Sequence, residues 1–209
     1  MSDQVNSLAP QSLAPAVPKR PKPGERRLQI LQTLAEMLQE PGGDRVTTAA
    51  LAARIQVSEA ALYRHFASKA QMFEGLIEFI ESTIFGLINK IAIDEADGLR
   101  QLSATLKMLL NFAERNPGMT RVLIGDALVT EDARLQTRIN QILDRIETSV
   151  KQSFRTAVTQ EKLAPNTEVA DRANVAMAFV MGRWLRYAKG GFKSAPSHLT
   201  EQQLTVLIT

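Results

Sequence analysis

The chain has 209 residues but no cysteine and only two histidines, His65 and His198. The absence of thiols excludes disulfide bonds, thiolate metal ligands and cysteine nucleophiles. Two imidazoles so far apart in the sequence do not have the spacing of a histidine metal site. We therefore expect no bound metal and no cofactor.

Long apolar runs are missing as well. No stretch reaches about 18 apolar residues, the length at which a membrane helix would be suspected. The N-terminus is polar and proline-rich where a signal peptide needs an apolar segment. We therefore expect a cytoplasmic protein that makes no contact with a membrane. Hydrophobic residues make up 44% of the chain and charged residues 22%, so a folded core is expected.

The sequence signatures of enzymes are also absent. No glycine-rich phosphate loop follows a strand pattern, and no two carboxylates have a spacing that would indicate a catalytic pair. No serine, histidine and acidic residue form a plausible catalytic set. The sequence therefore favours a protein that is not an enzyme.

The excess positive charge of the chain is confined to its first third. From Met1 to Lys69 there are nine basic and six acidic residues, whereas the remainder has sixteen of each. This excess would attract a polyanion to the N-terminal third. A solvated basic tail that aids solubility is the alternative explanation of the same pattern.

Residues 1–23 are rich in proline and poor in large apolar side chains. They cannot bury enough surface to offset the entropy of ordering, so we expect a flexible arm. Basic side chains at the end of this arm and at the start of the next segment can lie along phosphates. These side chains are Lys19, Arg20, Lys22, Arg26 and Arg27.

Residues 24–70 are predicted to form three helices. Apolar residues recur at spacings of three and four from Glu25 until Pro41 stops the pattern, which indicates a first helix. A short second helix follows, with Thr47 or Thr48 as its N-cap.

A third helix is expected from Glu59 to about His65, with Ser58 as its N-cap. Only about three residues separate it from the second helix, which is the spacing of a helix-turn-helix. The small side chains of Ala60 and Ala61 would let this helix approach base edges in a major groove. Polar side chains around the two helices can bind phosphate oxygens. These are Thr47, Thr48, Tyr63, His65 and Lys69.

Residues 71–209 are predicted to form a larger helical body. A capping box at Ser68 and Gln71 begins a long helix, and the predicted buried stripe of that helix includes Leu87. No segment shows the alternation of a strand, and no internal repeat occurs. The fold class is therefore all-α, with about nine helices.

Three further residues of the body lead to specific predictions. Thr130 and Thr167 each precede a helical pattern, so we expect them to be N-caps. Trp184 is the only tryptophan and lies in an extended apolar helix. We expect it to be buried at a dimer interface.

The helix-turn-helix segment resembles the signature of TetR-family regulators. The resemblance rests on Thr47-Thr48, Leu51-Ala52, Val57-Ser58, Leu62-Tyr63, His65-Phe66 and Lys69. It implies an N-terminal helix-turn-helix DNA-binding domain (residues 24–70) and a C-terminal helical dimerisation and partner-binding domain (residues 71–209). By position, the residues that face DNA would be Thr47, Thr48, Ser58, Glu59, Ala60, Ala61, Tyr63, Arg64, His65 and Lys69.

The chain resembles more narrowly the nucleoid occlusion factors within this family, in the segments SEAALYRHF, MFEGLIEFIE, ERNPGMTRVL and RLQTRINQILDRIE. This resemblance extends from about residue 25 to residue 155. It implies a nucleoid-associated homodimer that binds palindromic chromosomal sites and the C-terminal tail of the division protein FtsZ, and so prevents Z-ring assembly over the nucleoid. The groove for that tail would lie between the fourth and fifth helices, near Phe79, Leu87, Met108, Arg115 and Asn116.

A transcriptional repressor of the same fold, released from double-stranded DNA by a small apolar inducer, is the alternative. A sizeable closed cavity in the body would favour the repressor, whereas a packed body with a groove open to the surface would favour nucleoid occlusion. The methionines of the body are more typical of core packing than of a ligand pocket. We therefore expect no small-molecule ligand.

Overall fold

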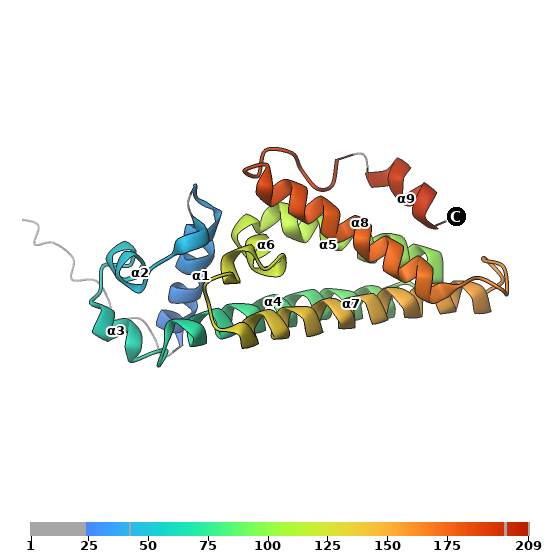
Figure 1. Cartoon of the computed structure of the whole chain (residues 1–209). Coiled ribbons are helices and arrows are strands. Elements are labelled where there is room, and N and C mark those ends of the chain that lie inside the picture. Colours follow the sequence, from blue (N-terminus) through green and yellow to red (C-terminus); the bar gives the residue numbers. More distant parts are fainter. Residues whose placement is uncertain (1–23, 42, 199, 209) are drawn as a thin grey trace, which may run out of the picture.

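The computed structural model describes residues 24–208 except residues 42 and 199, and these residues form an elongated, all-α molecule (Figure 1). The described part contains nine α-helices, two 3-10 helices and no strand, which confirms the predicted fold class. The basic arm predicted for residues 1–23 lies outside the described residues. The helices are α1 (Glu25–Gln39), η1 (Gly43–Arg45), α2 (Thr48–Arg54), α3 (Glu59–Tyr63), α4 (Lys69–Asp94), α5 (Gly98–Arg115), α6 (Pro117–Leu123), η2 (Asp126–Leu128), α7 (Ala133–Thr159), α8 (Val169–Lys189) and α9 (Thr200–Ile208).

Helices α1, α2 and α3 form a head at one end of the molecule (left in Figure 1). Each contributes a buried leucine to a shared core, namely Leu34, Leu51 and Leu62. Phe66 follows α3 and is buried as well, and the guanidinium carbon of Arg27 lies 4.0 Å from the centroid of its ring. This cation–π contact attaches the start of α1 to the end of the helix-turn-helix.

Helix α4 runs from the head along the whole body (Figure 1). It begins where predicted, because the Oγ of Ser68 accepts a hydrogen bond from the backbone N–H of Gln71 at 3.2 Å. The Gln71 side chain accepts from the backbone N–H of Ala67 at 2.9 Å rather than from that of Ser68. The predicted capping box is therefore only half formed.

The buried face of α4 repeats every four residues, as Ile80, Ile84 and Ile88 show. The prediction that Leu87 belongs to this face is wrong, because 38% of Leu87 is exposed. Position 87 is not one of the positions in this repeat, so its side chain lies at the edge of the buried stripe. Leu87 instead lines a surface groove between α4 and α5.

Helix α4 is also joined to α7 by ionic contacts. Arg138 donates a hydrogen bond to one carboxylate oxygen of Glu81 at 2.6 Å, and Arg145 donates to the other. The pKa of Glu81 is lowered, chiefly by the hydrogen bond from Arg138. Because these groups lie near solvent, the contacts contribute little to stability compared with the apolar core.

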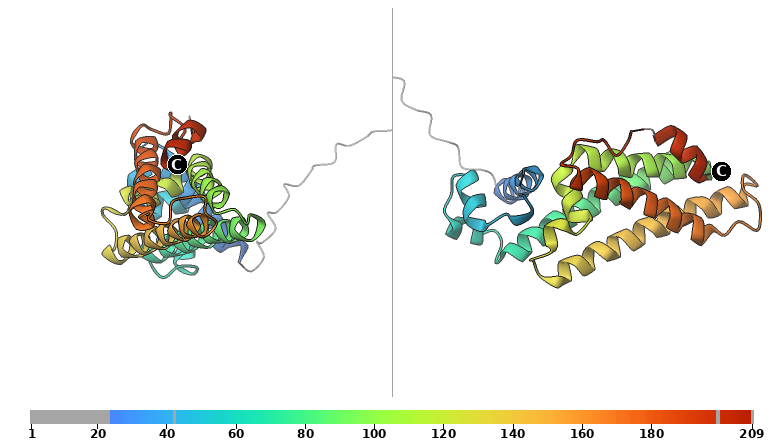
Figure 2. Two further views of the ribbon diagram at one scale, coloured as in Figure 1. Left: turned by 90° about the vertical axis from the view of Figure 1, so that its right-hand side faces the viewer. Right: turned by 45° about the horizontal axis from the view of Figure 1, so that its top comes forward.

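Helices α5, α7 and α8 pack with α4 to form the body, which the end-on view in Figure 2 shows as a bundle. Trp184 is completely buried inside this bundle, and its Nε1 donates a hydrogen bond to the backbone oxygen of Leu109 at 3.2 Å. The prediction that Trp184 is buried at a dimer interface is therefore wrong. A buried indole N–H needs an acceptor, and here a carbonyl of α5 supplies it.

Both threonine caps predicted for the body are wrong. Helix α7 begins after Asp132, whose carboxylate accepts a hydrogen bond from the backbone N–H of Arg134 at 3.1 Å, so Thr130 lies outside the helix. The hydroxyl of Thr167 donates to the backbone oxygen of Ala164 at 2.7 Å in the preceding turn, and α8 has no side-chain cap. Local hydrogen bonding of this kind competes with capping.

The head is attached to the body through α6, which packs against α1. At their contact the backbone of Gly118 lies so close to α1 that a Cβ atom there would be 1.9 Å from the backbone oxygen of Ala35. Arg121, also on α6, donates a hydrogen bond to the backbone oxygen of Glu40 at the end of α1, at 3.1 Å. The head therefore depends on a glycine at position 118 for its position on the body.

Among the described helices, none combines the length and the apolar character that a membrane crossing requires.

We predict that Gly118→Ala lowers the free energy of unfolding by about 1–3 kcal/mol, because the added methyl group would overlap the backbone of α1. The matched control is Gly86→Ala in α4, where nothing lies within 4 Å of the position that the added methyl group would occupy. There alanine should stabilise the helix by roughly 0.5–1 kcal/mol. Urea denaturation followed by circular dichroism measures both. Equal stability of Gly118→Ala and the unaltered protein would contradict the close contact.

Candidate nucleic-acid interface and partner groove

Helix α3 is held at the outer end of the head by a tight turn and a side-chain cap. Gln56 adopts a left-handed backbone conformation, with φ of 56°, in the turn between α2 and α3. The Oγ of Ser58 then accepts a hydrogen bond from the backbone N–H of Ala61 at 3.2 Å, as predicted for an N-cap. Glu59 and Ala60 are exposed on the first turn of α3, and Ala61 is half-buried.

The start of α2 is fixed relative to α3. The Oγ1 of Thr47 accepts a hydrogen bond from the backbone N–H of Ala50 at 3.1 Å, which identifies Thr47 rather than Thr48 as the N-cap. The hydroxyl of Thr48 donates to a carboxylate oxygen of Glu59 at 2.7 Å. This bond between the two helices sets their relative orientation, and the carboxylate of Glu59 keeps free lone pairs that can accept from a base amino group.

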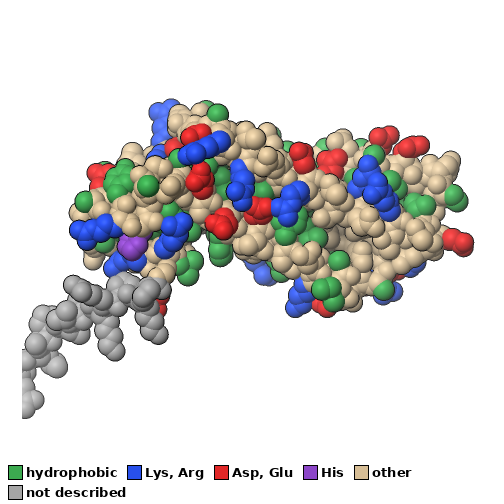
Figure 3. Space-filling model, turned by 90° about the horizontal axis from the view of Figure 1, so that it is seen from below, with side chains coloured by type: hydrophobic (Ala, Val, Ile, Leu, Met, Phe, Trp, Pro, Cys, Tyr) green, Lys and Arg blue, Asp and Glu red, His purple; other side chains and the backbone are tan. Residues whose placement is uncertain are grey.

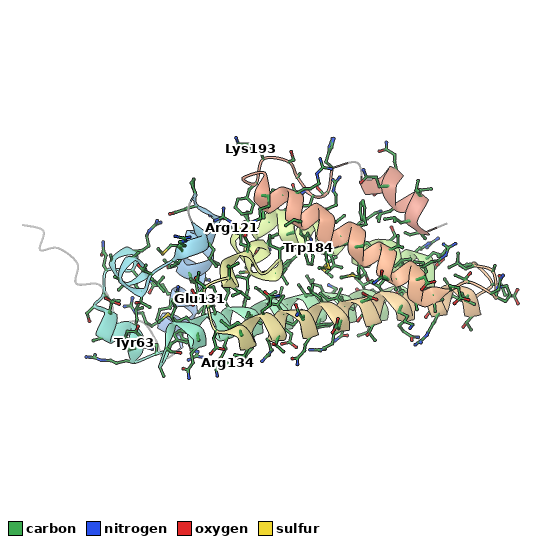
Figure 4. All side chains as sticks on the ribbon, viewed as in Figure 1. Tyr63, Arg121, Glu131, Arg134, Trp184 and Lys193 are labelled. Atoms are coloured by element: carbon green, nitrogen blue, oxygen red, sulfur yellow. The ribbon has the colours of Figure 1, made fainter. Side chains whose placement is uncertain are left out.

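The residues that follow α3 are exposed. The helix ends at Tyr63, two residues earlier than predicted. Tyr63 is 44% exposed, and Arg64 and His65 are also exposed. Arg27 donates a hydrogen bond to the backbone oxygen of His65 at 2.8 Å, which anchors this segment to α1. Figure 3 shows Lys and Arg side chains on the surface of the head around a histidine, and Figure 4 shows Tyr63 at the outer end of the molecule.

Lys69 has a partner that the sequence did not indicate. Its Nζ forms an ion pair with the carboxylate of Glu131, which lies in the segment between η2 and α7. The side chain of Glu131 is only 10% exposed, and that of Lys69 is 31% exposed. Figure 4 shows Glu131 where the head meets the body. A lysine predicted to bind phosphate thus already has a carboxylate partner in the free protein.

A surface groove of about 600 Å³ lies between α4 and α5. Phe79 and Leu87, both partly exposed, form one wall, and Met108 lies on the other. Arg115 and Asn116 close one end, where α5 stops. All five residues named from the sequence for a partner site therefore line one groove.

Six further residues complete the lining and were not identified from the sequence. The signal available for those on α4 was their spacing of four from Phe79 and Leu87, which places them on one face of a helix. The residues of α5 carried no separate signal. The six are Thr83, Ile91, Ala104, Lys107, Asn111 and Phe112.

A second hollow, of about 370 Å³, adjoins the groove and reaches the head. Arg115 and Asn116 line both hollows, and Gln32, Glu36 and Gln39 of α1 line the far side of the second. The end of the groove is therefore next to a helix of the head.

No group of three or more acidic or histidine side chains within the described residues is arranged to hold a metal ion.

The head combines a short exposed helix, set by a tight turn on a second short helix, with basic and hydroxyl side chains around it. This arrangement is that of a helix-turn-helix DNA-binding protein. Residues 30–76 match the family model described as bacterial regulatory proteins, tetR family. Residues 96–209 match the model described as tetracyclin repressor-like, C-terminal domain, of the SlmA type.

Similarity to individual proteins shows which family of helix-turn-helix proteins the chain belongs to. The chain is 49% identical over 186 residues to the nucleoid occlusion factor SlmA of Marinomonas sp. (strain MWYL1), which covers 89% of this chain and 94% of that protein. It is 50% identical over 178 residues to SlmA of Shewanella sp. (strain MR-4), covering 85% and 90%. The chain belongs to the SlmA family of nucleoid occlusion factors. The sequence predicted that the similarity to this family ends near residue 155. The similarity extends further, because the C-terminal family model matches as far as residue 209.

The fold is that of the wider TetR family. The regulator PfmR from Thermus thermophilus superimposes with a TM-score of 0.73 at 18% identity, covering 86% of this chain and 97% of that one. Members of these families are DNA-binding regulators rather than enzymes, which confirms the prediction that this protein is not an enzyme.

We predict that Glu131→Gln tightens binding to DNA of any sequence by about two- to fivefold, because loss of the carboxylate frees Lys69 for a phosphate at a gain of roughly 0.5–1 kcal/mol. Fluorescence anisotropy with a labelled duplex measures this. Asp144→Asn, which removes one negative charge from an exposed site on α7, is the control and should leave the affinity unchanged. Unaltered affinity of Glu131→Gln would show that Lys69 does not reach a phosphate.

Proposed function

We propose that the protein binds palindromic chromosomal sites as a homodimer through α3, and that it then binds the C-terminal tail of FtsZ in the groove between α4 and α5. Bound to the nucleoid in this way, it prevents Z-ring assembly over the chromosome. The observation that carries this proposal is the open groove, because it brings together all five residues that the family resemblance assigns to the tail. The similarity of the whole chain to proteins named nucleoid occlusion factors supports it.

The chemistry of the groove suits an extended or helical peptide that has both apolar and acidic side chains. The aromatic ring of Phe79 and the side chains of Leu87 and Met108 offer apolar surface for anchoring residues, as in other peptide grooves. Arg115 is exposed at the end of the groove and can form a bidentate bond with a carboxylate.

The DNA-facing residues proposed for the head are those exposed on or beside α3. Ala60 and Ala61 leave the first turn of α3 free of bulky side chains, so its backbone can lie close to base edges. Tyr63 and Arg64 lie where a helix in the major groove meets the phosphate backbone. Two such helices in a dimer should lie about 34 Å apart to read adjacent major grooves.

The exposed face of α8 is the proposed dimer interface. Val175, Met181 and Leu185 are exposed apolar residues on this face. Ala178 and Gly182 lie between them, and apart from the neighbouring residues and backbone of α8 itself no atom lies within 4 Å of the position that a Cβ at residue 182 would occupy. Small residues at this spacing allow a second helix to approach closely, and a self-complementary apolar face suits a two-fold dimer.

The alternative, a repressor with an apolar inducer, receives less support. Large side chains are fully buried in the bundle interior, among them Trp184 and Phe154. The groove lined by Phe79 opens to the surface instead. A repressor of this kind would need a closed cavity for its inducer, whereas an open groove suits a peptide partner, so the groove favours nucleoid occlusion.

An immobilised FtsZ tail peptide should retain the purified protein, and two groove variants should bind it at least about tenfold more weakly. Phe79→Ala removes apolar surface from the groove, and Arg115→Asp reverses its charge. The matched controls are Ile93→Ala, a residue that is 83% exposed on α4, and Arg155→Asp on the exposed face of α7. Surface plasmon resonance measures the affinities. Equal binding by groove variants and controls would exclude this groove as the tail site.

Tyr63→Ala should weaken binding to every DNA sequence by about fivefold, the effect of losing one phosphate hydrogen bond of roughly 1 kcal/mol. Ala61→Asn should instead change which sequences are bound, because it adds a donor and an acceptor to the base-facing side of α3. Selection from a random duplex library, followed by titrations at several salt concentrations, separates the two effects. The reverse pattern would show that α3 is placed wrongly on the DNA.

Gly182→Leu should dissociate the dimer, because the larger side chain fits the protomer but keeps a second α8 from approaching. Gly86→Leu is the matched control, since it places the same side chain at another open site. Sedimentation velocity should show a monomer for Gly182→Leu at concentrations where the control stays dimeric. A dimer of unchanged stability would move the interface away from this face.

A further inference from the structure

A separate surface pocket, of about 380 Å³, lies at the end of α8, and it shares no lining residue with the groove or with the hollow beside it. Its lining comes from the last turns of α8 and from the segment that follows, and it contains four side chains that are basic. No acidic residue lines it. The lining residues are Arg183, Arg186, Lys193, Ser194, Ala195, Pro196 and His198.

The charges of this pocket are not neutralised within the described residues. No ion pair there involves Arg186, Lys193 or His198. Lys189 is close in sequence but pairs with Asp126 outside the pocket. Glu114 is an acidic side chain that contacts this segment, and it accepts a hydrogen bond from the hydroxyl of Ser197.

Arg183 forms part of the pocket wall and is held in place by hydrogen bonds. Its Nε donates a hydrogen bond to the backbone oxygen of Pro196 at 2.9 Å, and a terminal nitrogen donates to that of Ala195 at 3.3 Å. These bonds hold the segment after α8 against the helix. Burial lowers the pKa of Arg183, and the positive charge of Arg186 lowers it further. Arg183 and Arg186 therefore hold two like charges at the same end of α8.

We propose that this pocket binds the phosphate group of a small anionic ligand. Guanidinium and ammonium groups are the side chains that recognise phosphate, and arginine binds it through two parallel hydrogen bonds. The volume lies within the range of small-ligand sites. Arg186 and Lys193 would contact the phosphate oxygens, while Arg183 shapes the wall and Ser194 offers a hydroxyl.

The pocket and the proposed DNA-binding helix lie on different parts of the molecule. Figure 4 shows Lys193 at the upper edge of the body and Tyr63 at the outer end of the head. The carbonyl end of α8 also attracts cations, but the helix dipole amounts to only about half a charge. It does not account for a pocket with two arginines, a lysine and a histidine.

The test is isothermal titration calorimetry of the full-length dimer with three probes: inorganic phosphate, pyrophosphate and adenosine monophosphate. We expect one site per protomer, with binding weakened at least about tenfold by Arg186→Gln and by Lys193→Gln, as expected for the loss of a charge-assisted hydrogen bond. Arg155→Gln is the matched control, because it removes one positive charge from an exposed site on α7. Adenosine monophosphate binding more tightly than phosphate would identify a phosphate ester as the ligand class, and the reverse order would identify the free ion.

Three results would overturn the proposal. The first is no heat of binding from any probe at millimolar concentration, and the second is equal weakening by Arg155→Gln. The third is dissociation of the dimer by Arg186→Gln without phosphate binding to the unaltered protein, since a carboxylate of the second copy would then fill the pocket. None of these measurements uses FtsZ or DNA, so the result does not depend on either of those partners.

Discussion

The contact between α6 and α1 is the constraint on which the arrangement of the molecule depends. Gly118 and Ala35 meet with no room for a side chain, so α6 holds the head at one position on the body. Helix α5 ends at Arg115, directly before α6, and Arg115 and Asn116 line both the groove and the hollow beside α1. A change in the position of the head would therefore alter the end of the groove.

A second connection between head and body is ionic. Lys69 opens the long helix α4, and its partner Glu131 precedes α7. The prediction for Glu131→Gln supposes that a DNA phosphate competes with Glu131 for this lysine, and binding of DNA would then change a contact that joins the two parts. The apolar contacts of α4 persist on either side of the pair, because its buried face extends from Met72 to Ile88. The pair can open without loss of the core.

The sequence predicted those features that depend on neighbouring residues. Thr47, Ser58 and the start of α4 at Ser68 follow from capping chemistry within a few residues. What it missed is of two kinds. The caps predicted at Thr130 and Thr167 were wrong for local reasons, because Asp132 caps α7 and the hydroxyl of Thr167 donates to the backbone oxygen of Ala164. The partners of two other side chains lie in distant parts of the chain, as for Lys69 and Glu131, which are sixty-two positions apart. Trp184 is the second case, because its N–H donates to a carbonyl of α5, which no pattern within α8 could indicate.

Because Arg115 and Asn116 line both the groove and the hollow beside α1, we propose that ligand binding in the groove and DNA binding by the head are coupled through α6. Binding free energies are reciprocal. If a ligand in the groove changes the affinity for DNA by some factor, DNA must change the affinity for that ligand by the same factor. The direct measurement is the affinity for a palindromic site, selected from chromosomal fragments, with and without saturating FtsZ tail peptide. Coupling predicts tighter DNA binding in the presence of the peptide, with an equal gain in peptide affinity on DNA. Identical DNA affinities in the two conditions would contradict it.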